Sequence, residues 1–345
     1  MDTKECCSCR PAKTEWYKNK VFIVTFIILV LCGLSYFVRF LVPFRESFWM
    51  YFKTIWWAVL IGLFLGGMIE HFVPREYISK MLAKPKKRTI FYSVILGFFM
   101  SACCHGILAL SIELYKKGAS IPAVISFLLA SPWANLPLTI MMLGFFGLKV
   151  FYIIFSAIVV AIITGLIFQF LERKNLIEKN KNIVSVDENF SILADIKRRT
   201  GEYKFSLKQI QYDIKGIVEG SVSLGNMVLW WILIGMGMAS LAGAYIPQHI
   251  FHQYMGPTAV GLLVTLFLAT IMEICSEGAA PLAFEIYRQT GALGNSFVFL
   301  MAGVVTDYTE IGLIWTNIGR KTAIWLPIIT VPQVIILGIL ANILF

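Results

Sequence analysis

Charged residues are scarce in this chain, and long stretches have none at all. Only 14% of the 345 residues are Asp, Glu, Lys or Arg, whereas 58% are hydrophobic and 27 are phenylalanine. Thr89–Ile112, Val150–Leu171 and Thr322–Phe345 carry no charge, and Gly220–Met272 continues without one for 53 residues. Apolar stretches of this length are typical of membrane-spanning helices. The composition excludes a soluble globular protein and predicts an all-α, polytopic membrane protein with about 8–10 transmembrane helices.

Motifs for nucleotide binding and hydrolysis are absent as well. The chain has no G-x-x-x-x-G-K-[ST] sequence, so it has no phosphate-binding loop that could draw energy from ATP. His71, His249 and His252 lie near the ends of predicted spans and form no hydrolase or metalloprotease pattern. We therefore predict that the chain is not an enzyme and needs no cofactor.

The excess of Lys and Arg residues lies in the segments that connect the apolar stretches. The formal net charge is +10, and the loop 73–88 holds six Lys or Arg against one acid. Cytoplasmic loops of membrane proteins are enriched in Lys and Arg, so we assign this loop and the polar linker 172–215 to the cytoplasmic side. The basic charge thus indicates topology in a lipid membrane, and no nucleic-acid partner is expected.

The N-terminal region predicts a polar cytoplasmic tail, residues 1–20, followed by a signal-anchor helix, residues 21–42. The apolar part is too long for a cleaved signal peptide and lacks an A-x-A site. The tail contains Cys6, Cys7 and Cys9, and thiolates this close together can chelate a soft metal ion that a soluble donor delivers. The alternatives are a disordered tail with incidental cysteines or a lipidation site.

The second half of the chain repeats the first. Trp57-x4-Gly62 returns as Trp230-x4-Gly235, 173 residues later. Cys103-Cys104-His105-Gly106 aligns with Cys275-Ser276-Glu277-Gly278 at an offset of 172. Such matches at a nearly constant offset predict an internal duplication. The predicted membrane repeats are residues 45–171 and residues 216–345.

The two basic segments limit how each repeat can cross the membrane. Three apolar stretches lie between 73–88 and 172–215, so one of them cannot cross completely. The candidates are the Cys103–Gly106 region and Ser131–Pro137, because proline breaks a helix and irregular backbone at membrane depth survives only where it is buried or lines a cavity. One broken or re-entrant helix per repeat gives an inverted repeat, which is common among secondary transporters. Four full crossings per repeat would instead give a parallel repeat.

Four residues are predicted to mark the helix breaks at the centre of the protein. They are Gly106, Gly278, Pro132 and Pro137. Glycine permits a close backbone approach, and a helix beginning after each glycine would point its positive N-terminal end at the site. Breaks in such repeats meet near the bilayer midplane, so the two halves are expected to build one shared site.

The residues beside these breaks suit a soft metal or metalloid substrate. Cys103, Cys104 and Cys275 offer thiolates, which bind soft cations and trivalent arsenicals. His105 would add an imidazole ligand or carry protons, and Asn135 completes the predicted substrate-binding set. The alternatives are thiols that pack as small hydrophobic groups and a histidine that only packs between helices.

Ionisable residues inside a membrane are energetically unfavourable and mark functional sites. We predict that Glu277, Asp307 and Glu273 exchange protons when the substrate leaves. The alternative for Asp307 is a cap where a broken helix resumes. Glu113 and Glu285, each beside a basic residue and a tyrosine, are expected at membrane interfaces.

Two motifs and the duplicated layout carry a family resemblance. Cys275-Ser276-Glu277 and Gly303-Val-Val-x-Asp307 make residues 45–345 resemble the predicted-permease family, which includes the ArsP-type organoarsenical efflux permeases and related copper/zinc exporters. The resemblance implies an inner-membrane exporter. The first break departs from the family's usual Cys-Ser-Cys-Gly by reading Cys103-Cys104-His105-Gly106, and the added histidine and the Cys-rich tail favour a metal ion.

We therefore predict a multi-pass protein of the cytoplasmic membrane that exports a soft metal ion or a trivalent organoarsenical by secondary transport. The predicted path is a Cys/His/acid site at the interface of the repeats. One alternative is a membrane sensor or scaffold that binds partners through the tail and the linker. Another is an exporter of an uncharged organic solute.

Overall fold

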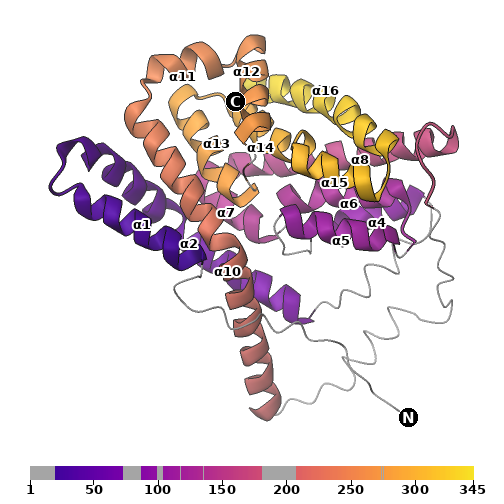
Figure 1. Ribbon diagram of the computed structural model, residues 1–345, viewed down its shortest axis with the longest axis horizontal. Helices are drawn as coiled ribbons and strands as arrows, with labels where there is room; N and C mark the ends of the chain where they lie inside the picture. Colours follow the sequence, from indigo (N-terminus) through magenta and orange to yellow (C-terminus); the bar gives the residue numbers. More distant parts are fainter. Residues whose placement is uncertain are drawn as a thin grey trace.

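The computed structural model is all-helical in the residues that it describes (Figure 1). These are residues 20–72, 87–98, 104–116, 118–134, 136–180, 207–272, 274 and 276–345, and no strand occurs among them. The α-helices are α1 (Lys20–Leu34), α2 (Val42–Phe72), α4 (Lys87–Phe98), α5 (Cys104–Lys116), α6 (Ile121–Ala134), α7 (Leu136–Phe146), α8 (Val150–Arg173), α10 (Leu207–Tyr245), α11 (Gln248–Met255), α12 (Ala259–Met272), α13 (Ser276–Thr290), α14 (Leu293–Val305), α15 (Tyr308–Asn317) and α16 (Arg320–Leu344). Two 3-10 helices, η2 (Arg39–Leu41) and η3 (Gly147–Lys149), precede α2 and α8.

Five helical stretches within this part of the chain are long and apolar enough to cross a membrane. They are Arg39–Met68, Leu138–Arg173, Val228–Tyr245, Leu293–Asn317 and Arg320–Leu344. A sixth candidate is the pair α11 and α12, which is bent by 101°. The prediction of an all-α polytopic membrane protein is confirmed. Full spans are fewer than expected because several apolar stretches form helices that are too short to cross alone.

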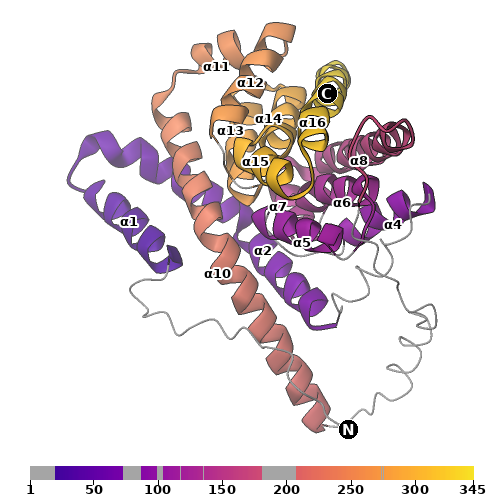
Figure 2. The ribbon, with the colours of Figure 1, turned by 45° about the vertical axis from the view of Figure 1, so that its right-hand side comes forward.

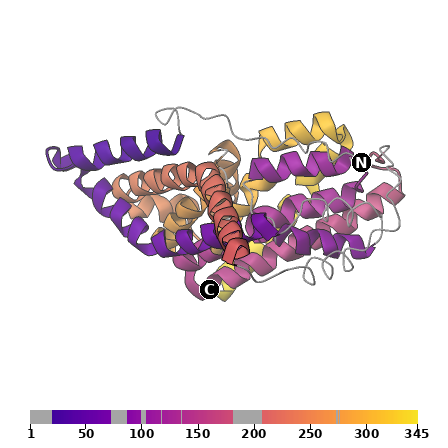
Figure 3. The same cartoon turned by 90° about the horizontal axis from the view of Figure 1, so that it is seen from below.

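The N-terminal helix is shorter than the signal anchor predicted at 21–42. Helix α1 has 15 residues, so it is about 22 Å long, whereas the hydrocarbon core of a bilayer is about 30 Å thick. The chain turns after Leu34 and α2 begins at Val42, so the predicted anchor is interrupted by this turn. Helix α1 lies on the outside of the molecule against α2 and α10 (Figures 2 and 3).

The order of the helices confirms the internal duplication. Three helices of the first half begin at Cys104, Ile121 and Leu136, and their counterparts α13, α14 and α15 begin 172 residues later at Ser276, Leu293 and Tyr308. By the same correspondence, α2 matches α10 and α8 matches α16. The contacts repeat too: α4, α6 and α8 pack together as do α12, α14 and α16, and α5 touches α15 as α13 touches α7.

Helices α2 and α10 are equivalent in the repeat and pack against each other antiparallel. Gly67 near the end of α2 lies against Ser221, and the ring of His71 further on lies against Gly216. Residues later in α2 therefore contact residues earlier in α10. This contact is the most extensive between any two helices of the described chain.

Helices α8 and α16 are antiparallel in the same way. Near the start of α8, the Tyr152 hydroxyl donates to the Leu337 carbonyl at 2.7 Å. Further along, Thr164 Oγ1 accepts from Gln333 Nε2 at 3.1 Å, so the partner lies earlier in α16. Equivalent helices that run in opposite directions across a membrane belong to an inverted repeat, whereas a parallel repeat would give them the same direction.

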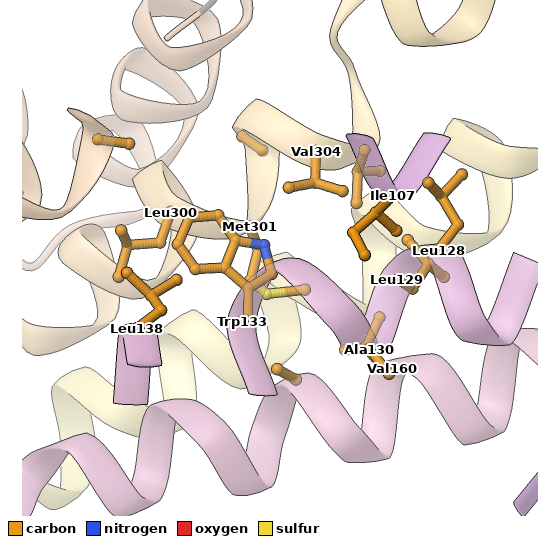
Figure 4. Packing of buried hydrophobic residues seen from close by; sticks show 14 of the residues in the cluster. Ile107, Leu128, Leu129, Ala130, Trp133, Leu138, Val160, Leu300, Met301 and Val304 are labelled. Carbon is orange, nitrogen blue, oxygen red and sulfur yellow. The ribbon is translucent and has the colours of Figure 1, made fainter. Parts of the chain in front are cut away.

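The core is centred on α6 and α14, which pack against each other across the boundary between the halves. Trp133 of α6 has no exposed surface, and Figure 4 shows it beside Leu300 and Met301 of α14. In a lipid surrounding, helices associate through close packing more than through the hydrophobic effect. Fully buried side chains of this protein therefore lie where the two repeats meet.

The linker between the halves, predicted at 172–215, is helical at its end and docked at its start. Helix α10 already begins at Leu207. At the start, Glu178 accepts hydrogen bonds from the amides of Lys321 and Thr322 at 2.9 and 3.1 Å, and from the Thr322 hydroxyl at 3.0 Å. Burial raises the pKa of the Glu178 carboxyl, but these hydrogen bonds outweigh burial, and the pKa lies below its ordinary value of 4.5. A residue of the linker thus caps α16.

Replacing Glu178 with Gln should lower the melting temperature of the purified protein at neutral pH. Because the pKa is lower in the folded state, the carboxylate stabilises the fold above about pH 4.5, and this contribution is lost as the pH falls through the lowered pKa. Melting curves of wild type and E178Q should therefore converge in acid. A melting-temperature difference that stays constant from neutral to acidic pH would contradict this role.

Candidate transport site

The helix boundaries of the two halves correspond near the predicted site residues. Helix α5 follows α4 as α13 follows α12, and α7 follows α6 as α15 follows α14. Among the described residues, the chain is non-helical at Ile274, between α12 and α13, and at Thr306 and Asp307, between α14 and α15. The connecting residues of the first half, 99–103 and Asn135, lie outside the described part of the chain.

The breaks lie slightly apart from the residues predicted to mark them. The helices resume at Cys104 and Ser276, so Gly106 and Gly278 are in the first turn of a helix and do not precede it. Pro132 lies inside α6, which continues to Ala134. Pro137 is the second residue of α7, where a missing amide donor is tolerated because the first amides of a helix have no partner within it.

Part of the predicted site falls outside the residues that the structure describes. These residues are Cys103, Asn135, Glu273 and Cys275, together with Cys6, Cys7 and Cys9 in the tail. Cys104 and His105 form the start of α5, and the described part of the chain does not include their side chains. The meeting of Cys103 and Cys275 at one point therefore stays a prediction. Within the described ranges, no three His, Cys, Asp or Glu side chains form a group that could hold a metal ion.

The two breaks of the second half lie side by side. The hydroxyls of Thr270, at the end of α12, and Thr306, at the end of α14, are 2.7 Å apart. Ile274 lies in the first break, and its carbonyl oxygen is 3.7 Å from the position that a Cβ would take on Gly303. The segments that carry Glu277 and Asp307 are thereby brought together.

Helix α10 closes this region from another side. A Cβ on Gly235 would overlap the carbonyl of Gly278, and Gly278 in turn lies against Ile274 and the backbone of Trp231. The glycine pair therefore allows α10 and α13 to approach as closely as small residues permit in membrane proteins. Gly278 therefore allows the close backbone approach that was expected of it.

Three carboxyl groups are buried beside these breaks. Glu277, Asp307 and Glu310 have exposed fractions of 5%, 4% and 0%. Glu277 Oε2 accepts a hydrogen bond from the Ser276 hydroxyl at 3.0 Å. Asp307 Oδ1 accepts from the amides of Thr309 at 2.7 Å and Glu310 at 3.1 Å. The cap that the sequence offered as the alternative for Asp307 is therefore present at the start of α15.

A further polar cluster was missed from the sequence. Glu285, expected at a membrane interface, is only 1% exposed. Its carboxylate accepts hydrogen bonds from Tyr51, Arg288 and Gln289. Glu285 and Arg288 are three residues apart on one helix, a spacing that pairs opposite charges. The partner Tyr51, 234 residues earlier in the chain, had no comparable signal.

The chain matches the family described as predicted permeases (ArsP_1) over residues 46–343. It belongs to this family. The predicted-permease resemblance is thus confirmed over nearly the range proposed for it. As a permease, the protein is a multi-pass membrane transporter, and the family favours this over an enzyme and over a sensor or scaffold.

The relatives are distant but cover most of the chain. The UPF0718 protein YcgR of Bacillus subtilis is 23% identical over 283 residues, which are 81% of this chain and 90% of the relative. A Streptococcus mutans protein, named as a proposed subunit of a two-component membrane permease complex, is 23% identical over 72% of this chain and 78% of its own length. A ribitol transporter of Klebsiella pneumoniae is 27% identical over a shorter part, 34% of this permease and 30% of the relative. No solved structure matches the chain.

Substitution of Gly235 by Ala should destabilise the protein by about 1–3 kcal/mol, because the added methyl group overpacks the contact with α13. Gly237 on the same helix is the matched control. A Cβ there meets nothing within 4 Å, so Gly237→Ala should leave stability unchanged or raise it by up to about 1 kcal/mol. Thermal unfolding of both variants in one detergent compares them, and equal melting temperatures would contradict the close approach of α10 and α13.

Variants of Asp307 separate its cap from a role in proton exchange. Asp307→Ala should destabilise the protein by about 1 kcal/mol, whereas Asp307→Asn keeps an acceptor for the two amides and should melt like wild type. Thermal unfolding checks this, and a D307N protein as unstable as D307A would refute the cap. Transport at wild-type level by D307N would remove Asp307 from the proton-exchanging residues.

Proposed function

We propose that this permease exports a soft metal ion or a trivalent organoarsenical across the cytoplasmic membrane by secondary transport. Cys103, Cys104 and Cys275 bind the substrate, with His105 and Asn135 assisting. The acids Glu277, Asp307 and Glu273 exchange protons as the substrate leaves.

The observation that carries this proposal is that two equivalent helices, α5 and α13, begin at the thiol-bearing motifs. Cys104 opens α5, and Cys275 directly precedes α13, which begins at Ser276. The N-terminal end of a helix carries a positive partial charge, which lowers the pKa of a nearby thiol and favours the thiolate. Broken helices in inverted repeats commonly hold substrates and coupling ions near the midplane.

The buried acids supply the second part of the mechanism. Glu277 is two residues from Cys275 and is nearly fully buried. Burying a carboxylate is costly, and a bound cation or a proton at this place would reduce that cost. Binding of the substrate cation and binding of protons would then compete, and proton entry would drive substrate exit.

Uptake into everted membrane vesicles tests the proposal. Wild-type vesicles should accumulate at least one of methylarsenite, Cu(I) and Zn²⁺ when a proton gradient is imposed. Replacing Cys103, Cys104 and Cys275 together by Ser should reduce that uptake by roughly tenfold or more, because removal of groups that hold a metal commonly has effects of this size.

The control variant is Cys32→Ser, because Cys32 lies in α1, which packs on α2 and α10 at the outside of the molecule. It should transport like wild type. Equal uptake by wild type and the triple serine variant would refute the ligand assignment. The same would follow from equal loss in C32S and in the triple variant.

The second candidate is export of an uncharged organic solute, with the thiols packing as small apolar groups. The observation in its favour is the similarity to a ribitol transporter over about a third of the chain. Ribitol is therefore the additional substrate in the vesicle assay. Uptake of ribitol that is insensitive to the three Cys→Ser changes, without uptake of any soft ion, would favour this candidate.

A further inference from the structure

Glu285 is the centre of a buried hydrogen-bond cluster that lies outside the proposed substrate site. Its carboxylate accepts from the Tyr51 hydroxyl, from Arg288 Nε and Nη2 at 2.7 Å each, and from Gln289 Nε2 at 2.6 Å. Tyr51 has no exposed surface, and Glu285 is 1% exposed. Removing one partner of a buried charge leaves that charge uncompensated, so the cluster is stable only while its members stay together.

The cluster joins the two halves of the protein. Tyr51 comes from α2 of the first repeat, and Glu285 comes from α13 of the second. The ring of Tyr51 lies 6.3 Å from that of Phe145 on α7 and 6.2 Å from that of Phe284 on α13. Helix α10 closes the remaining side, because a Cβ on Gly243 would overlap the Glu285 carboxylate.

A second contact holds the same end of α13. Lys149 Nζ, directly before α8, donates to the Tyr287 hydroxyl at 2.5 Å, and Tyr287 also lies 5.8 Å from Phe146 between ring centroids. The 24 residues of α8 span about 36 Å. The linker leaves the far end of α8, so the Glu285 cluster and the linker lie at opposite ends of this helix.

The duplication predicts an equivalent cluster at the linker end, but the residues there cannot form it. The repeat places Glu113 opposite Glu285 and Leu224 opposite Tyr51. A leucine offers no hydroxyl donor, and Glu113 is exposed where Glu285 is buried. Of these two equivalent glutamates, only Glu285 is buried and accepts from a tyrosine of the other half.

The linker end is held by different contacts. The Tyr115 hydroxyl of α5 lies 3.4 Å from the Ile318 carbonyl beside α15. Asn180 of the linker donates to the carbonyls of Tyr115 and Ala119 at 2.7 Å each. Each end thus has its own fastening between the two halves, and only one of the two depends on a buried carboxylate.

Alternating access in an inverted repeat moves one repeat against the other around a fixed site, so contacts between the halves must break at the end that opens. We propose, on the basis of the transport function proposed above, that Tyr51, Glu285 and Arg288 form a lock that keeps the transport path closed at the end where α13 finishes, opposite the linker. Glu285 is the positioning residue of this lock. Because the two ends are held by different contacts, the free energy needed to open each end differs. This difference determines which end is closed at rest.

Hydrogen–deuterium exchange of the purified full-length protein in lipid nanodiscs tests the lock without any cargo. Glu285→Gln removes the charge, and Tyr51→Phe removes only the hydroxyl while keeping the ring packing. A hydrogen bond to a charged group shifts an equilibrium by roughly tenfold or more. Both variants should therefore exchange roughly tenfold faster in the peptides of α13 and α7, with unchanged exchange in α5 and α15.

The matched control is Glu113→Gln, the same change at the equivalent position of the other repeat, which should alter neither set of peptides. The double variant Y51F/E285Q should open no further than E285Q alone, because both changes break one cluster. Unchanged exchange in α13 and α7 in both Y51F and E285Q would overturn the proposal. Faster exchange spread evenly over both halves would also overturn it, since that is the signature of general destabilisation.

Discussion

The structure depends on one constraint: a polar group away from water must find its hydrogen-bond partner inside the protein. Continuous helices satisfy this requirement by themselves, but each helix break exposes amides and carbonyls. Asp307 meets it by accepting from two amides at the start of α15. Glu178 does the same for α16 from the linker. At both of these helix starts, a carboxylate thus accepts hydrogen bonds from amides that have no partner within the helix.

Duplication explains why such places occur in pairs. Two copies of one helical unit pack around a pseudo-twofold relation, with α2 against α10, α6 against α14 and α8 against α16. At the described breaks of the second half, the contacts Thr270–Thr306 and Gly235–Gly278 come from that same half. The copies have since diverged in their side chains, and Cys104 and His105 in one stand opposite Ser276 and Glu277 in the other.

The proposed transport mechanism depends on this divergence. In that proposal, cysteines of both halves bind the substrate, whereas the carboxylates that exchange protons, Glu277, Asp307 and Glu273, all belong to the second half. The contacts that join the two halves also differ between the two ends of the protein. One relies on the buried Glu285 and the other on linker residues such as Asn180. The two repeats thus share one arrangement of helices but differ in the side chains at equivalent positions.

The sequence alone determined the class of protein and the duplication, because these follow from local features: uncharged runs and a constant offset between motifs. The prolines and glycines located the breaks only to within a few residues. For Asp307 the sequence offered a helix cap as the alternative to proton exchange, and this cap is present. The tertiary structure decided the rest. Only the fold brings Tyr51 to Glu285, because residues 234 positions apart have no pattern that relates them. The fold also buries Glu285, which was expected at a membrane interface, and makes it the centre of a hydrogen-bond cluster. Packing between helices decided other features: the turn after Leu34, the early start of α10 and the residues at which helices begin. The periodicity of a single segment carries no information about that packing.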